Sequence, residues 1–580
     1  MLFLHYNESN TKIGGLFMQF SEYKYERPNF NETKIEFEKL LNKITTSNYK
    51  EQLNIIKEIN TIRNKIDTMS NLAHIRHTID TNDDFYDKEK NHWDEISPLY
   101  QELDTLFYKE LLKSKFLDQL KIELGIQFFS LIEYSLKAFS PEIIENLQEE
   151  NKEISKYVKL LASAKISFQG EERNLSGMTP FLESSDRRVR KSAYEAKSNF
   201  FTTYEKDFDE IYDNLVKIRT KIANKLGYDN YVELGYIRMN RVDYNDKMVD
   251  NFRKQVVKEI VPIASSLYVR QKERLNLTTL NYYDERFEFE SGNPTPKGTP
   301  QWIIDQGKKM YHEMSQETAE FIDYMINNDL MDLTTKKGKA GGGYCTFIPD
   351  YKSPFIFSNF NGTSGDVDVL THEAGHAFQV FRSKHIEIPE LLWATYESSE
   401  IHSMSMEFFA WDWMENFFKE DKDKYFYSHL GGAIKFIPYG VLVDHFQHEV
   451  YKNPNLTPNE RKTIWRELEK QYKPHTIYDE NEFLENGGWW FQQSHIFEVP
   501  FYYIDYTLAQ ICALQFWKKM IHNREGAWKD YLHLCSLGGT KSFLGLLEEA
   551  NLISPFKDNC IKNITEDVKN FLSSIDDKKL

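Results

Sequence analysis

Two histidines and a glutamate are spaced so that they could hold a metal ion and activate water. His372, Glu373 and His376 form the pattern H-E-x-x-H. On an α-helix, side chains four residues apart lie on one face, so both imidazoles could bind a single ion. Glu373 lies beside that face and could take a proton from a metal-bound water. The pattern predicts metal-assisted hydrolysis, although five residues alone also fit a surface helix with two solvated histidines.

The residues around the motif predict a helix with one buried face and one face turned to a metal. Asp368, His372 and His376 form a polar stripe at positions i, i+4 and i+8. Apolar residues recur at helical spacing on the nearly opposite side: Val367, Leu370, Ala374, Phe378 and Phe381.

Asp368 stands one helical turn before His372 and is a candidate partner for its second ring nitrogen. A zinc-bound histidine usually donates its other N–H to a carboxylate or carbonyl, which fixes its tautomer and orientation. An acid near a helix N-terminus is equally well explained by the helix dipole.

A third metal ligand is expected from the segment between Ala394 and Glu407. Zinc catalysis needs three protein ligands and an open position for water. Glu397 and Glu400 both lie on this predicted helix, and spacing alone does not choose between them; His402 is a further candidate. Glu407, seven residues after Glu400, shares its face and could support a histidine.

Taken together, these segments resemble the oligoendopeptidase F branch of the thimet oligopeptidase family of zinc metallopeptidases. In that family the third ligand is the first Glu of a segment whose second Glu follows seven residues later. Glu400 and Glu407 match these two places. The resemblance therefore implies one Zn²⁺ per chain held by His372, His376 and Glu400, with Glu373 as the general base.

A tyrosine-rich segment near the C-terminus extends the same resemblance. It begins at His495 and runs to Tyr506. His495 and Tyr506 match residues that stabilise the transition state in this family, and Tyr503 matches a further tyrosine. Hydrogen-bond donors of this kind act on the oxyanion that forms during amide hydrolysis. Aromatic packing alone would also explain a run of tyrosines in a chain with 34 of them.

Two extended segments before the metal motif predict strands. One runs from Tyr344 to Ile348 after a glycine-rich stretch, and the other from Phe355 to Asn361. An exposed strand edge beside a metal-binding helix would bind a peptide through main-chain hydrogen bonds. We assign this role to the second segment, in particular to Phe355, Ile356, Phe357, Ser358 and Asn359.

Composition limits the classes of partner. A formal net charge of −17 over 580 residues argues against nucleic acid, since phosphate binding needs a basic face. No apolar stretch is long enough for a membrane span. Four cysteines in so long a chain do not make a disulfide framework, which favours a reducing, cytoplasmic location. We expect oligopeptide partners and a monomer or homodimer.

The pattern of helical segments and breaks divides the chain into regions. We expect an extension that is disordered (1–17), an N-terminal helical lobe (18–190), a helical region joining the lobes (191–335), a catalytic zinc region with C-terminal helices (336–570) and a tail (571–580). Residues 33–160 predict long antiparallel helices, and a further helix should begin near Ser184 and reach about Leu226. The strongest break, Gly292–Pro300, should lead into a helix near Gln301.

The expected fold is mainly α-helical, with a small β-sheet beside the zinc-binding helices. The resemblance further implies a two-lobed ellipsoid with a deep central channel that admits short unfolded peptides. The expected function is zinc-dependent hydrolysis of internal peptide bonds. The alternatives are a carboxypeptidase or dipeptidyl carboxypeptidase on the same scaffold, or a non-catalytic peptide-binding protein.

Overall fold

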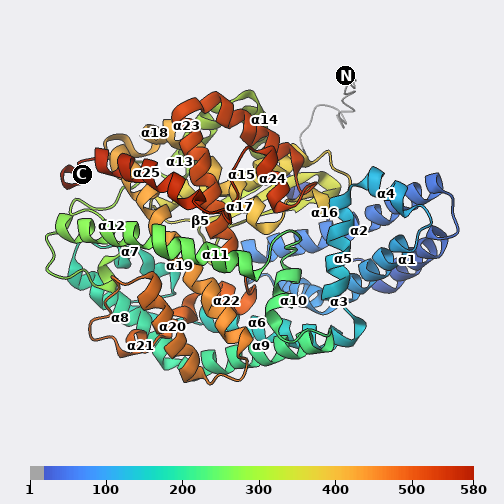
Figure 1. The fold of residues 1–580 in the computed structure, drawn as a ribbon, viewed down its shortest axis with the longest axis horizontal. Helices are drawn as coiled ribbons and strands as arrows, with labels where there is room; N and C mark the ends of the chain where they lie inside the picture. Colours follow the sequence, from blue (N-terminus) through green and yellow to red (C-terminus); the bar gives the residue numbers. More distant parts are fainter. Residues whose placement is uncertain (1–17) are drawn as a thin grey trace.

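A computed structural model describes residues 18–580, which form an elongated and mainly α-helical molecule (Figure 1). The first helices lie at one end of the long axis, and the C-terminal residues lie toward the other end. The predicted helical fold class is therefore confirmed. The predicted disorder of residues 1–17 falls outside the described residues.

Long helices fill residues 30–162, as the periodicity of this region predicts. Polar side chains cap the first three of them. In the second, the Asn48 side chain accepts from the Glu51 N–H, and the Glu51 side chain accepts from the Asn48 N–H. The helices are α1 (Phe30–Ile44), α2 (Tyr49–Ile79), α3 (Asp84–Leu112), α4 (Leu117–Leu124), α5 (Ile126–Ala138) and α6 (Ile144–Ala162).

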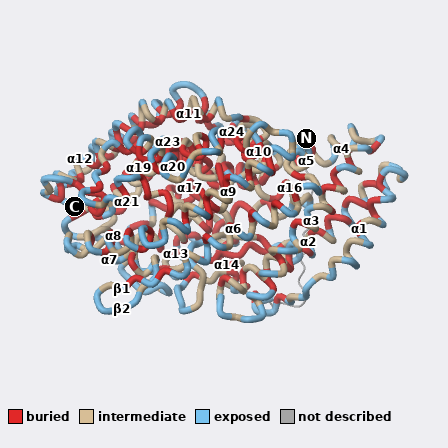
Figure 2. Tube along the Cα trace, turned by 90° about the horizontal axis from the view of Figure 1, so that it is seen from below, coloured by how far each residue is buried: buried red, intermediate tan, exposed pale blue. Residues whose placement is uncertain are grey.

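The middle of the chain is also helical, with one exposed hairpin at its start. The hairpin pairs β1 (Ile166–Phe168) with β2 (Glu171–Arg173) and lies at the periphery in Figure 2. The helices that follow are α7 (Thr179–Leu182), α8 (Arg187–Thr203), α9 (Glu205–Lys225), α10 (Tyr231–Arg238), α11 (Asp246–Glu259), α12 (Val261–Arg274), α13 (Pro300–Met314) and α14 (Gln316–Asn327).

Two sequence predictions in this region have different outcomes. The single helix expected from about Ser184 to Leu226 is wrong, because the backbone leaves helical geometry at Tyr204 (φ −104°, ψ 20°) and separates α8 from α9. The helix expected near Gln301 is confirmed, since α13 begins at Pro300, where proline's fixed φ suits a first helical turn.

A three-stranded sheet precedes the H-E-x-x-H helix. Its strands are β3 (Met331–Thr334), β4 (Tyr344–Ile348) and β5 (Ser353–Phe360), so both predicted strand segments are confirmed. The order is β3-β5-β4, with β3 parallel and β4 antiparallel to β5. Both β4 and β5 pack on the helix that carries the motif.

The assignment of β5 as an exposed substrate-binding edge is wrong. Phe355, Ile356, Phe357, Ser358 and Asn359 lie in the central strand, which has a hydrogen-bonded neighbour on both sides. Four of these five side chains are buried, as expected for a central strand covered by a helix. The edge strand on one side of β5 is β4.

The C-terminal half surrounds the motif helix with long, buried helices. Figure 2 shows buried residues gathered along central helices, among them α17, α19 and α23. The elements are α15 (Gly365–Ser383), α16 (Pro389–Leu392), α17 (Tyr396–Phe409), α18 (Met414–Phe418), α19 (Lys422–Lys452), α20 (Pro458–Tyr472), α21 (Glu482–Glu485), α22 (Ser494–Glu498), α23 (Tyr503–Leu537), α24 (Phe543–Glu549) and α25 (Cys560–Ser574).

Residues 18–580 show neither a membrane-spanning helix nor a disulfide. No helix there is long and apolar enough to cross a membrane. The four cysteines, which are Cys345, Cys512, Cys535 and Cys560, are unpaired.

Gly375, inside the H-E-x-x-H motif, lets α15 and α17 approach closely. A Cβ atom added to Gly375 would lie 2.6 Å from Ser403 Cα and 2.7 Å from the His402 carbonyl oxygen, both backbone atoms of α17. Such contacts are too short for a real side chain, so no other residue fits without moving a helix. The glycine therefore sets the distance between the two helices that carry the candidate ligands.

We predict that Gly375→Ala destabilises the protein by about 1–3 kcal/mol, because the new methyl group overpacks the contact between two helix backbones. Thermal or urea unfolding would measure the loss. Gly432→Ala in α19 is the matched control: no atom lies within 4 Å of its added Cβ, so it should leave stability unchanged or raise it by up to about 1 kcal/mol. Equal effects of the two substitutions would contradict the role given to Gly375.

Candidate metal centre

His372 and His376 on α15 face Glu400 on α17. Glu400 Oε2 lies 3.3 Å from His372 Nε2 and 3.4 Å from His376 Nε2. One ligand atom from each residue lies within 4.8 Å of the other two. Two imidazole nitrogens and one carboxylate oxygen are the donor set of many catalytic zinc sites. The three residues predicted as ligands are thus brought together.

The other candidates for the third position lie elsewhere. The Glu397 carboxylate accepts a hydrogen bond from Thr395 Oγ1 at 2.8 Å. Both ring nitrogens of His402 are buried without a partner among residues 18–580. The two side chains are on the same helix as Glu400, but neither belongs to the group of close ligand atoms that Glu400 forms with the histidine pair. The choice between Glu397 and Glu400, which spacing left open, therefore falls to Glu400.

The charges around the three residues suit a cation. Burial raises the pKa of the Glu400 carboxyl, but His376 and His372 outweigh it and hold that pKa well below its usual range. Burial lowers the pKa of His372, but Glu400 and Glu407 outweigh it and raise that pKa well above the usual value. The carboxylates of Glu400 and Glu407 therefore stabilise positive charge at the histidines between them, and a bound metal ion would supply such a charge.

Glu407 fixes the orientation of His372. Its Oε1 accepts from His372 Nδ1 at 2.7 Å, which leaves the lone pair of Nε2 directed at the cluster. Its Oε2 accepts from His429 Nε2 at 2.8 Å. Trp411 Nε1 donates to His429 Nδ1 at 3.1 Å, and this fixes the tautomer in which His429 donates to Glu407. Sequence reasoning found Glu407 but not the histidine on α19 behind it.

Asp368 does not make the contact predicted for it. It accepts a hydrogen bond from Tyr425 at 2.7 Å, whereas the carboxylate on His372 Nδ1 is that of Glu407. Burial raises the pKa of Asp368 to about 6. The prediction that Asp368 accepts a hydrogen bond from His372 is therefore wrong, because the Glu407 carboxylate from α17 already accepts the bond from His372 Nδ1.

Glu373 is buried beside the cluster and has a free carboxylate oxygen. Its side chain is 8% exposed, and its Oε2 has no hydrogen-bond partner within the described part of the chain. Burial raises the pKa of this carboxyl, against the effect of His372 and His376. A buried carboxylate oxygen without a partner is costly unless something else binds there.

Tyr502 is a residue of this site that sequence reasoning missed. Its hydroxyl donates to Glu400 Oε1 at 2.5 Å, while Ser403 Oγ donates to Glu400 Oε2 at 3.0 Å. The preceding residue, Phe501, has φ +68°, and its backbone is held by Gln447 and Arg241. This strained turn between α22 and α23 directs Tyr502 at Glu400. A non-glycine residue with positive φ has no clear sequence signal.

His495 and Tyr506 both lie against Tyr502, with ring centroids 5.6 Å and 4.9 Å from that of Tyr502. Tyr506 Oη lies 3.3 Å from His495 Nε2. Tyr439 donates to Gln493 Oε1 at 2.7 Å, so the amide group of Gln493 donates to His495 Nδ1, at 2.9 Å. His495 then carries its proton on Nε2. Burial lowers the pKa of His495 to about 4, so the ring is a neutral donor.

Tyr503 packs beside these residues. Its ring lies 5.0 Å from that of His495 and 5.4 Å from that of Tyr506. Its hydroxyl has no hydrogen bond to another described residue. The tyrosine-rich segment thus supplies three neighbouring rings, those of Tyr503 and Tyr506 at the start of α23 and that of Tyr502 just before it.

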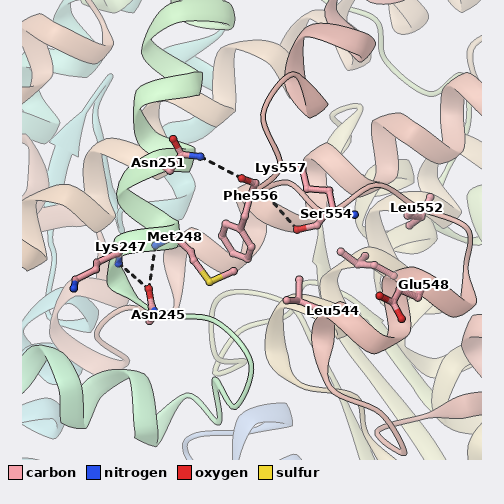
Figure 3. A pocket seen from close by; sticks show the side chains of 11 residues that line it. Asn245, Lys247, Met248, Asn251, Leu544, Glu548, Leu552, Ser554, Phe556 and Lys557 are labelled. Atoms are coloured by element: carbon pink, nitrogen blue, oxygen red, sulfur yellow. Dashed lines mark hydrogen bonds between the residues drawn. The ribbon is translucent and has the colours of Figure 1, made fainter.

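A separate pocket of about 500 Å³ lies away from this chemistry. Figure 3 shows that side chains of α11 and of the segment around α24 line it, with Asn251 bonded to the Phe556 carbonyl. No candidate ligand, base or oxyanion donor is among its lining residues. This pocket is therefore separate from the candidate metal centre.

Comparison with known proteins identifies the family. Residues 20–139 match the Peptidase M3 N-terminal domain, and residues 181–566 match Peptidase family M3. The chain belongs to peptidase family M3. The two matched ranges together cover most of the chain and include every residue of the candidate site.

Similar proteins support the narrower resemblance to oligoendopeptidase F. Oligopeptidase PepF of Bacillus subtilis is 21% identical over 379 residues, covering 64% of this chain and 55% of that protein. The chain thus spans about half the length of this curated relative.

Two solved structures are more similar to this chain. PZ peptidase A, solved with an inhibitor, is 57% identical with a TM-score of 0.95. An oligoendopeptidase F from Bacillus anthracis, described as putative, is 54% identical with a TM-score of 0.91. Each match covers 97% of this chain and 100% of the other. The predicted membership in this branch is confirmed.

We predict that Glu407→Ala weakens binding of a divalent metal ion about 10- to 100-fold, because His372 loses the partner that orients it. Competition with a chromogenic chelator would measure the dissociation constant. Asp368→Asn is the matched control, since Asp368 bonds to Tyr425 instead of a ligand. A larger loss with Asp368→Asn than with Glu407→Ala would show that the wrong carboxylate has been assigned.

Proposed function

We propose that the protein is a zinc-dependent endopeptidase that hydrolyses internal bonds of short, unfolded oligopeptides. The observation that carries this proposal is the free, buried Oε2 of Glu373 beside two histidines and a glutamate that can share one ion. A protein that only binds peptides has no use for a buried carboxylate without a partner at such a site. Family membership supports the same reaction class.

The donor set supports zinc as the metal. His372, His376 and Glu400 offer two nitrogens and one oxygen, a combination common in zinc hydrolases. When bound, zinc would lower the pKa of a coordinated water to about 7 and polarise the peptide carbonyl. The contact of Glu407 with His372 would keep that imidazole in the tautomer that presents Nε2.

Glu373 would act as the general base. Its burial raises its pKa, which makes the carboxylate a better proton acceptor than one in water. It would take the proton of the attacking water and pass it to the amine that leaves. The second step restores the ionised carboxylate for the next turnover.

His495 and Tyr506 would stabilise the negative charge that develops on the carbonyl oxygen. The relay from Tyr439 through Gln493 leaves the His495 proton on Nε2, the atom next to the Tyr506 hydroxyl. Two fixed donors in a desolvated site cost little reorganisation when the charge forms. Tyr503, which has no hydrogen bond within residues 18–580, would contribute shape or a further donor.

The free edge of β4 would bind the substrate backbone in place of β5. Asn71 of α2 donates to the Phe347 carbonyl oxygen, at 2.8 Å, on the side of β4 away from β5. Successive residues of a strand turn their N–H and C=O groups to opposite sides. Cys345, two residues before Phe347, therefore turns its N–H and C=O to the same side as Phe347, away from β5. A Cβ at nearby Gly343 would lie 3.5 Å from Glu373 Oε1. A peptide paired with this edge would therefore lie beside the base.

Two further properties belong to the proposal. The substrate is an oligopeptide, and neither nucleic acid nor a membrane takes part; the net charge of −17 supports the first exclusion. The protein acts in the cytoplasm as a monomer or homodimer, and its four unpaired cysteines suit a reducing compartment.

We predict that Glu373→Gln retains zinc but loses at least about a thousandfold of kcat, because the amide cannot accept the water proton. Cleavage of a quenched fluorescent oligopeptide, with zinc content measured on each protein, would test this. Near-normal cleavage by the variant would remove Glu373 as the base. Zinc-loaded wild-type protein that cleaves no peptide would favour the binding-protein alternative.

We also predict that Gln493→Leu lowers kcat about 10- to 100-fold with little change in KM, because His495 loses the partner that sets its tautomer. Steady-state kinetics on the same peptide would separate the two constants. Tyr439→Phe, which removes the hydroxyl that orients Gln493, should cause a smaller loss in the same constant. A change confined to KM would show that the pair binds substrate and does not support its reaction.

A further inference from the structure

Tyr396 is an aromatic residue that lies one helical turn before the third candidate metal ligand. It is the first residue of α17, and Glu400 is four residues further along the same helix. Side chains at this spacing share one face of a helix, with Cβ atoms about 5–6 Å apart. Glu400 is 2% exposed, whereas Tyr396 is 43% exposed. The tyrosine therefore borders the candidate metal centre with a ring that the protein does not cover.

Tyr502 connects Tyr396 to the ligand by direct contact. The ring centroids of Tyr396 and Tyr502 are 5.1 Å apart and their planes meet at 61°, the edge-to-face arrangement that aromatic pairs prefer. The Tyr502 hydroxyl donates to Glu400 Oε1 at 2.5 Å. The ring of His495, an oxyanion donor in the proposed mechanism, lies 5.6 Å from that of Tyr502. Tyr396 is thus separated by one ring from both the metal ligand and the oxyanion donor.

The backbone just before Tyr396 is held in place by two other segments of the chain. Ser383 Oγ, at the end of α15, donates to the Leu392 carbonyl at 2.9 Å. A Cβ atom on Gly539 would lie 2.1 Å from the Trp393 carbonyl oxygen, so the segment after α23 packs directly on this backbone. A rigid aromatic side chain on a fixed backbone loses little conformational entropy when it binds, which is the condition for a preorganised contact.

The position of Tyr396, more than its exposure, points to the substrate. A single exposed apolar ring on a protein surface is ordinary. This ring, however, is one helical turn from a metal ligand. Consecutive Cα atoms of a peptide are about 3.8 Å apart. A peptide whose carbonyl lies at the metal therefore brings the residues on either side of the cleaved bond within reach of Tyr396.

We propose that Tyr396 binds a large apolar or aromatic side chain of the substrate residue next to the cleaved bond, which makes the enzyme selective for such residues. The inference rests on the proposed peptidase function and adds the side-chain class of its substrate. Main-chain pairing with a strand edge supplies affinity but does not distinguish side chains, so selectivity comes from the side chains that line the site. The residue bound supplies either the carbonyl or the amine of the cleaved bond.

Four quenched fluorescent peptides would test the proposal. They share one sequence and carry Phe or Ala at each of the two positions that flank the cleaved bond. Mass spectrometry of the products identifies the bond that is cut, so that rates are compared for that bond only. The wild-type protein should show a kcat/KM about 10-fold higher for Phe than for Ala at one of the two positions. That position is the one whose side chain contacts Tyr396.

Tyr396→Ala should reduce this preference to about twofold or less, through a lower kcat/KM for the Phe peptide. Tyr396→Phe should retain the preference, because the contact is made by the ring. Tyr204→Ala is the matched control, since Tyr204 is 37% exposed and its ring packs on Phe200 at the junction of α8 and α9. The control should leave the preference unchanged.

Three results would overturn the proposal. They are a wild-type protein that cuts the Phe and Ala peptides equally at both positions, a Tyr396→Ala variant that keeps the preference, and a Tyr396→Ala variant that loses the same factor of activity on all four peptides. The last result would mean that Tyr396 only supports Tyr502 and Glu400.

A binding measurement separates these failures from failure of the peptidase proposal. The same peptides are bound to zinc-loaded Glu373→Gln protein, and fluorescence anisotropy follows the binding. If the wild-type protein cleaves no peptide, a preference for Phe in binding that disappears in Glu373→Gln/Tyr396→Ala still supports the role of Tyr396. Equal binding of the Phe and Ala peptides would then overturn that role as well.

Discussion

The contact between the backbones of α15 and α17 is the constraint on which the site depends. Gly375 allows the helices to approach until the added Cβ of any other residue would collide with Ser403 and the His402 carbonyl. At this separation the ligand atoms of Glu400, His372 and His376 lie within 4.8 Å of one another. The glycine lies between the two histidines of the motif. The same turn of α15 therefore supplies two of the metal ligands and makes room for the helix that carries the third, Glu400.

Around this contact, nearly every polar group of the site is oriented by another. Glu407 holds His372, and His429 holds Glu407. Gln493 likewise fixes the proton of His495. Among the carboxylates of the site the exception is Glu373, whose Oε2 has no partner within the described residues. A site in which the supporting groups are bonded and the base is free is organised for chemistry and not for stability.

The sequence predicts the helical fold, both strand segments and the histidine pair, because these depend on periodicity and short spacings. The choice of Glu400 as third ligand comes from the family resemblance, since spacing leaves Glu397 equally possible. It did not predict contacts that depend on tertiary structure. Asp368 and Glu407 are equally suitable carboxylates in sequence, and only the crossing of α17 decides between them. Strand order is likewise invisible locally, so the sequence does not show that β5 is the central strand of its sheet. The position of Tyr502 depends on the strained turn at Phe501.

The most direct test of this account is the position of the metal in crystals of zinc-loaded protein. Anomalous diffraction collected above and below the zinc absorption edge would identify the metal as zinc and locate it without assuming which residues bind it. The account predicts one strong peak per chain, about 2.0–2.2 Å from His372 Nε2, His376 Nε2 and a Glu400 oxygen. A chain without a peak there, or with zinc held by other residues, would contradict it.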